Sequence, residues 1–138
     1  MKRLCLLACL AGLPLPALAA SPVTLQPGVV LAAVPVGQEA GRSVVLFAPG
    51  PGGRVSGGVA SAEGDLICPE AWQARASVED DTLSFTEITL APAPCESWDA
   101  LRDFATRLGR VGSEVVTDEG ILLMDAAGQP LLRLTVAG

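Results

Sequence analysis

The chain has 138 residues, enough for one domain with a hydrophobic core of its own but too few for several. Its 15 acidic and nine basic residues give a formal net charge of −6, which repels nucleic-acid phosphates and anionic membrane surfaces. Because the sequence contains no His and no Tyr, general acid–base catalysis would depend on carboxylates alone, and an enzyme is disfavoured.

The first 19 residues have the pattern of a secretory signal peptide. Lys2 and Arg3 precede an uncharged apolar segment at 4–18, and an A-x-A cleavage motif ends at Ala19. The apolar segment is shorter than the roughly 20 residues that a membrane-spanning helix needs. We predict cleavage after Ala19, a periplasmic or secreted protein, and no transmembrane segment in the mature chain.

A lipoprotein anchor is the alternative for the same region. The sequence Leu6-Leu7-Ala8-Cys9 resembles a lipobox, in which Cys9 would be the lipidated residue. That processing would leave about five apolar residues before the cysteine, fewer than the roughly 7 to 15 of an ordinary signal peptide. We therefore favour the cleaved signal.

Cleavage after Ala19 would leave 119 residues, which we divide into an irregular lead at 20–27 and a single domain at 28–138. The mature chain keeps seven arginines, no lysine and all 15 acids, so its formal net charge is −8. Such a charge favours solubility and permits a basic partner. We expect a monomer.

Two cysteines remain in the mature chain, Cys68 and Cys95. An even number of cysteines in an exported protein favours a disulfide over free thiols. A Cys68–Cys95 bridge would join positions 27 residues apart, and loop closure on that scale stabilises a fold by about 3–4 kcal/mol. The chain has no C-x-x-C motif for redox catalysis, and two thiols without a histidine make a poor zinc site, so we predict no metal and no cofactor.

Short strands are predicted through the first half of the domain. β-branched runs at 29–34 and 43–47 indicate two strands, and a proline- and glycine-rich segment at 48–53 indicates a loop. That loop lacks the Lys-Ser/Thr and the following helix of a phosphate-binding loop. Val55 and Val59 suggest a short strand interrupted by glycines. A loop at 61–65 and a short apolar run at 66–68 come after this strand.

An alternating pattern indicates two longer strands in the middle of the chain. Residues 72–78 alternate, and the apolar side chains of one face are Trp72, Ala74, Ala76 and Val78. The acidic turn Glu79-Asp80-Asp81 leads into a strand at 83–90, whose alternation shifts near Thr86 as it would at a β-bulge.

One amphipathic helix is predicted at 97–108. Its apolar side chains fall within one arc of about 120° at 3.6 residues per turn. They are Trp98, Leu101, Phe104, Ala105 and Leu108. Ser97 is a suitable N-cap, and Gly109 a suitable C-terminal stop.

Three strands at 111–117, 121–124 and 131–136 are predicted to form a closing meander, with turns at 118–120 and 126–129. About eight strands and one inserted helix predict an α+β, mostly β fold. In this fold an antiparallel sheet is curled into an open or closed barrel with its apolar face wrapped on the helix.

From residue 55 to the end, the order of these elements resembles the META domain family, the group of the heat-shock protein HslJ. The matching pieces are 54–57, 72–85, 89–95, the helix at 98–108, and 121–132. Two features differ: Cys68 is followed by Pro69 rather than Asn, and the family's opening Trp is absent. The resemblance implies the fold, an exported or envelope-anchored location, a link to stress tolerance and no catalytic activity. It implies no site residues for this chain.

We expect a non-catalytic domain that binds an envelope component or supports the cell envelope under stress. Two alternatives remain: an acidic inhibitor of a basic hydrolase such as lysozyme, and a carrier of a small apolar ligand in the barrel mouth. The carboxylates of Glu79, Asp80 and Asp81 suggest solvated turn residues rather than a catalytic or calcium site, because a calcium ion needs about six oxygen ligands. Trp72 and Trp98 are expected in the core.

Overall fold

The computed structural model describes residues 22–37, 43–91 and 98–137, which contain eight strands, one α-helix and two short 3₁₀ turns. The strands are β1 (Leu31–Pro35), β2 (Ser43–Pro49), β3 (Arg54–Ser61), β4 (Leu66–Glu79), β5 (Thr82–Leu90), β6 (Val111–Thr117), β7 (Gly120–Asp125) and β8 (Pro130–Val136). The helix is α3 (Trp98–Leu108), and the 3₁₀ turns are η1 (Val23–Leu25) and η2 (Pro51–Gly53).

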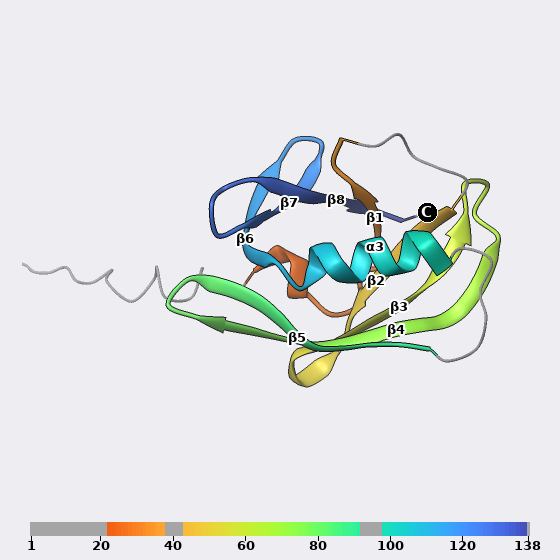
Figure 1. Ribbon diagram of the computed structural model, residues 1–138, viewed down its shortest axis with the longest axis horizontal. Helices are drawn as coiled ribbons and strands as arrows, with labels where there is room; N and C mark the ends of the chain where they lie inside the picture. Colours follow the sequence, from red (N-terminus) through yellow and green to blue (C-terminus); the bar gives the residue numbers. More distant parts are fainter. Residues whose placement is uncertain (1–21, 38–42, 92–97, 138) are drawn as a thin grey trace, which may run out of the picture.

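All eight strands belong to one antiparallel sheet in the order β5-β4-β3-β2-β1-β8-β7-β6. The two edge strands, β5 and β6, contact each other but form no ladder within the described residues, so the curled sheet is not closed. Helix α3 lies between the β3–β5 part and the β6–β8 part of the sheet (Figure 1). The predicted α+β, mostly β class is confirmed, in its open form.

The predicted apolar face of the helix is the buried face. Leu101, Phe104 and Leu108 are each at most 1% exposed, whereas Asp99 and Arg102 are exposed to solvent. A single buried stripe of this kind is the usual reason that a short helix is stable in a folded domain.

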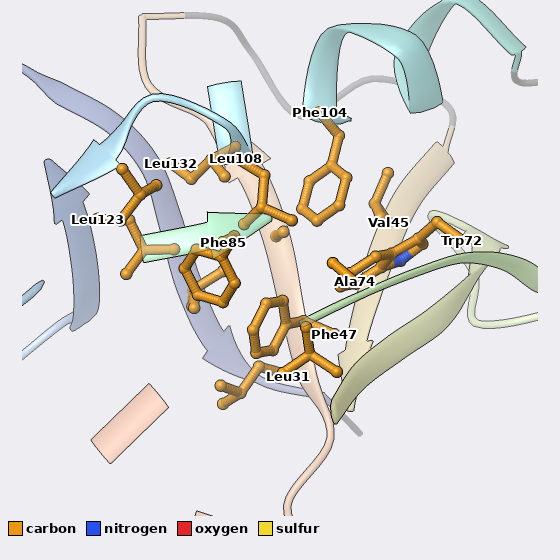
Figure 2. Packing of buried hydrophobic residues seen from close by; sticks show 14 of the residues in the cluster. Leu31, Val45, Phe47, Trp72, Ala74, Phe85, Phe104, Leu108, Leu123 and Leu132 are labelled. Carbon is orange, nitrogen blue, oxygen red and sulfur yellow. The ribbon is translucent and has the colours of Figure 1, made fainter. Parts of the chain in front are cut away.

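Aromatic side chains fill the space between helix and sheet (Figure 2). The ring of Phe104 lies 4.8 Å from that of Trp72, which in turn lies 5.5 Å from Phe47. Phe85 meets Phe47 edge to face at 5.8 Å. These centroid distances are those of favourable aromatic pairs, which add to the stabilisation from area burial. Trp72 is therefore a core residue, as predicted, and Trp98 packs partly buried against the same cluster.

Three strand boundaries differ from the prediction. β1 begins at Leu31; Val29 and Val30 are exposed, although the carbonyl of Val30 still accepts the N–H of Ala137 at 2.9 Å. β2 continues to Pro49, which lies beyond Phe47, the last residue of β2 paired with β1. β4 is one strand of 14 residues rather than an apolar run and a separate strand.

Pro69 is tolerated inside β4 because the ladder is irregular there. The β3–β4 register shifts between the pairs Gly57–Trp72 and Val59–Cys68, so one residue of β3 faces three of β4. Proline lacks the N–H that a regular ladder requires and is found at such irregularities.

The predicted bulge in β5 is present, one position from where the alternation shifts. Arg75 pairs with Thr86 and Gln73 pairs with Thr89, so two residues of β5, Glu87 and Ile88, lie opposite one residue of β4. Glu87 has a φ of +53°, the left-handed conformation of a bulge residue. Because of the extra residue, odd-numbered positions of β5 face the core before the bulge and even-numbered positions face it afterwards. Leu83 and Phe85 are buried before it, and Ile88 and Leu90 pack against the core after it.

The N-terminal lead is docked on the sheet rather than irregular throughout. The carboxylate of Glu114 on β6 accepts hydrogen bonds from the backbone N–H of Val23 at 2.8 Å and of Thr24 at 2.9 Å. It also accepts a hydrogen bond from the hydroxyl of Thr24, which is completely buried. One strand carboxylate therefore holds η1 in place.

Several sequence predictions fall outside the described residues. These are the signal peptide at 1–19, the lipobox with Cys9, the N-cap Ser97 and the second cysteine, Cys95. Cys68 lies on β4, half-buried beside the core, and its bridge to Cys95 stays a prediction. No helix in the described part of the chain has the length and hydrophobicity to cross a membrane.

Candidate binding groove

Acidic side chains gather in two separate hairpin turns. Glu79, Asp80 and Asp81 are exposed at the β4–β5 turn, and Asp118 and Glu119 are exposed at the β6–β7 turn. Among the described residues, no group of three or more His, Cys, Asp or Glu side chains is placed to hold a metal ion. These acids are therefore surface charges.

A groove of about 550 Å³ crosses β2, β3, β4 and the end of β5, and we call it the outer groove. This volume lies in the range of small-molecule sites. Its lining residues are Val30, Leu46, Ala48, Ser56, Gly57, Gly58, Leu66, Pro69, Glu70, Trp72, Gln73, Thr89, Leu90 and Ala91.

Two consecutive glycines of β3 lie in the outer groove. Gly57 is paired with Trp72, whose indole N–H donates a hydrogen bond of 3.0 Å to the carbonyl of Leu46 on β2. A Cβ at Gly57 would clash with that same carbonyl oxygen, and a Cβ at Gly58 would clash with the carbonyl of Cys68. The close approach of neighbouring backbone carbonyls therefore requires glycine at both positions.

A row of polar side chains crosses the groove on the face of the sheet turned away from the helix. Ser56 on β3 pairs with Gln73 on β4, which pairs with Thr89 on β5. All three are exposed, while Val55 and Ala74, their neighbours along the strands, are buried. The alternation of strand side chains therefore gives this outer face three hydrogen-bonding groups side by side.

Beyond the polar row, a second hollow of about 280 Å³ has basic walls. Arg54 and Arg75 are direct cross-strand partners, and the Nε of Arg75 lies 3.5 Å from a carboxylate oxygen of Glu87. Within the described residues Arg54 makes no ion pair. The bulge places Glu87 beside Arg75, so this end of the outer face has two guanidinium groups and one carboxylate.

The opposite end of the groove is apolar and open to water. Leu66, which pairs with Ala60, is 57% exposed, and the exposed Pro69 also lines the groove. Glu70 is the one charged residue in the lining of this groove. The outer face thus changes from apolar through polar to basic over β3 and β4.

A second feature is the tip of the β6–β7 hairpin, residues 115–119, which we call the hairpin tip. Val115 is 44% exposed and Val116 is 57% exposed, although successive residues of a strand point to opposite faces. Both faces of the hairpin are therefore in solvent at its end. The Thr117 hydroxyl accepts the N–H of Glu119 and donates to the carbonyl of Gly120, which orders the acidic turn.

No protein-family model, no curated protein and no solved structure matches this chain. The resemblance to the META domain family therefore stays a prediction.

Sequence reasoning placed Gln73 and Arg75 on the polar face of a strand but did not connect them to Arg54, Ser56 or Thr89. The signal available was the alternation of β3, which its two glycines obscure. The irregular β3–β4 register, which brings these residues into rows, has no local sequence signal.

Proposed function

We propose that this protein is an exported, non-catalytic binding domain of the cell envelope, of the META type, and that the outer groove is its binding surface. The signal pattern at 1–19 and the acidic mature chain support the location. The order of strands and helix agrees with the order of elements in the META resemblance. An apolar hollow with a few convergent polar groups is the usual form of a binding site.

The observation that carries the proposal is the combination of polar and apolar side chains in the outer groove. Ser56, Gln73 and Thr89 place three exposed hydrogen-bonding groups side by side. Leu66, which is 57% exposed, adds an apolar wall to the same lining. A hollow of about 550 Å³ with such a lining suits a ligand that has both an apolar and a polar part.

Affinity capture from an envelope extract tests the proposal. The exported wild-type protein is the bait, and Leu66→Asp places a charge at the exposed apolar wall of the groove, where it should abolish capture of a specific component. Val78→Asp is the matched control, because Val78 is an exposed apolar residue at the opposite end of the same strand. Equal capture by wild-type and Leu66→Asp baits would exclude the groove as the binding surface.

Inhibition of a basic hydrolase is a second candidate function, favoured by the hairpin tip. Exposed valines beside Asp118 and Glu119 combine an apolar contact with negative charge, which complements a basic cleft. Within the described residues these two acids make no ion pair, so their charge is available to a partner.

An assay against a basic muramidase tests this second candidate. The double variant Asp118→Asn, Glu119→Gln should weaken inhibition roughly tenfold, as loss of complementary charge at an interface does. The control is Asp80→Asn, Asp81→Asn, which removes two charges from the other acidic turn with side chains that tolerate positive φ. Absence of inhibition by the wild-type protein, or equal loss in both variants, would reject it.

A further inference from the structure

We propose that the ligand of the outer groove is a fatty acid, with its carboxylate at Arg54 and its acyl chain over Gly57 and Gly58. This inference rests on the proposed function, because it names the ligand class of the same groove. It follows from the charge, the spacing and the direction of the groove.

The basic end of the outer face carries one net positive charge, which suits a ligand with a single negative charge. Arg54 and Arg75 are cross-strand neighbours, and like charges placed opposite each other destabilise a sheet unless they are neutralised. Glu87 lies beside Arg75 and offsets one of the two charges. One guanidinium charge is left at Arg54, which matches a singly charged carboxylate better than a dianionic phosphate.

The spacing along β3 matches a head group followed by a chain. Residues two apart on a strand are separated by about 7 Å, so Ser56 lies about 7 Å and Gly58 about 14 Å from Arg54. A carboxylate at Arg54 would therefore place the first carbons of its chain beside the polar row. The rest of the chain would reach the hollow over Gly57 and Gly58.

The charges at the two ends fix the direction of the ligand. Glu70 lies opposite Gly58 in the β3–β4 register and repels a carboxylate from that part of the groove, whereas the net positive charge at Arg54 attracts it. The apolar walls at Leu66 and Val30 are exposed, and an acyl chain against them would remove apolar surface from water, which is the main driving force of such binding. In the described part of the interior, the rings of Trp72, Phe47 and Phe104 pack against one another.

Calorimetric titration of the full exported protein with laurate, below its micelle concentration, tests the inference. Saturable binding to the wild-type protein is expected. Arg54→Gln should weaken laurate binding about tenfold, the loss expected for one charge-assisted hydrogen bond. It should leave binding of dodecanol, the neutral isostere, unchanged. Leu66→Asp should weaken both ligands, because it acts on the apolar wall.

Two control variants separate the groove from general effects. Arg133→Gln removes an exposed charge of β8, outside the groove, and Val78→Asp adds a charge at the far end of β4. Both should bind laurate as the wild-type protein does, and circular dichroism checks that every variant is folded. An equal loss with Arg54→Gln and Arg133→Gln would overturn the site.

The outcomes also distinguish this inference from the proposed function. Absence of laurate binding together with Leu66-dependent capture of an envelope component would overturn the ligand class and leave the groove as a binding surface. Absence of both would overturn the inference and the proposed function together.

Discussion

A single side chain, Asp125, stabilises the β7–β8 turn through hydrogen bonds. Its Oδ1 accepts the N–H of Ala127 and of Gln129, each at 2.9 Å, and its Oδ2 lies 3.2 Å from the guanidinium of Arg110. The hydrogen bond from Gln129 is the largest cause that lowers the pKa of Asp125 below its ordinary value of 3.8. Those from Ala127 and Arg110 act in the same direction, and partial burial opposes them.

Because this pKa is lowered by folding, Asp125 stabilises the folded state above pH 3.8, and that contribution is lost as the pH falls through the folded value. We expect Asp125→Asn to lower the free energy of unfolding at pH 7 and to make its decline below pH 3.8 less steep. Urea unfolding over a pH series measures both. The control Asp118→Asn removes an exposed turn carboxylate, and equal slopes for Asp125→Asn and the wild-type protein would contradict the expectation.

The β4–β5 turn is strained at two aspartates. Glu79 pairs with Thr82, and the two residues between them, Asp80 and Asp81, have φ of +49° and +66°. This is a two-residue turn of type I′, whose preferred second residue is Gly. Asp81→Gly should therefore raise the free energy of unfolding by about 0.5 kcal/mol, and Asp81→Ala should lower it by about 1 kcal/mol. Thermal unfolding distinguishes them, and a lower melting temperature for the Gly variant would show that the turn is not of this type.

The helix contributes three buried side chains to the core, Leu101, Phe104 and Leu108. Leu108 is completely buried at its C-terminal end, where the curled sheet surrounds it. Leu108→Ala should lower the free energy of unfolding by about 3 kcal/mol, the usual cost of such a cavity. Arg102→Ala, on the exposed face of the same helix, should change it by less than about 0.5 kcal/mol. Comparable losses in the two variants, measured by urea unfolding, would refute the assignment of the buried face.

The docked lead is a second element, which the carboxylate of Glu114 and the packing of Leu25 against the core hold in place. Glu114→Ala removes the acceptor of three hydrogen bonds and leaves the buried Thr24 with unsatisfied donors. We expect a loss of about 1–3 kcal/mol and faster hydrogen exchange at the amide of Thr24. Glu119→Ala, in the exposed β6–β7 turn, is the control. Unchanged protection of the Thr24 amide in Glu114→Ala would show that the lead is held by other contacts.

Elements with strong periodicity were predicted from the sequence almost to the residue, because burial on one face dictates the pattern. The helix stripe of Leu101, Phe104 and Leu108 and the closing meander are examples. The continuity of β4 through Pro69 was missed, because it depends on a register shift against β3 that local sequence does not encode. The outer groove was missed for the same reason: its rows join residues such as Arg54 and Thr89 that only strand pairing brings together.

At the scale of the whole molecule, the untested predictions concern processing and cross-linking. Intact mass spectrometry of the exported protein should give a chain that begins at Ala20 and is two hydrogens lighter than its reduced sequence. The first result would establish cleavage after Ala19, and the second would establish the Cys68–Cys95 bridge. A mass that corresponds to a chain with Cys9 and an added lipid would instead indicate a membrane-anchored lipoprotein.

The edges of an open sheet are places where a second molecule can add a strand, and β5 is such an edge. The left-handed Glu87 breaks the straight line of donors and acceptors that an incoming strand would need, and its charged side chain stands at the break. The bulge at Glu87, which turns Ile88 and Leu90 toward the core, thereby also hinders the pairing of β5 with a strand of another molecule. Concentrated solutions of this protein should stay free of fibrils, although no ladder joins the two edge strands, β5 and β6, in the described residues.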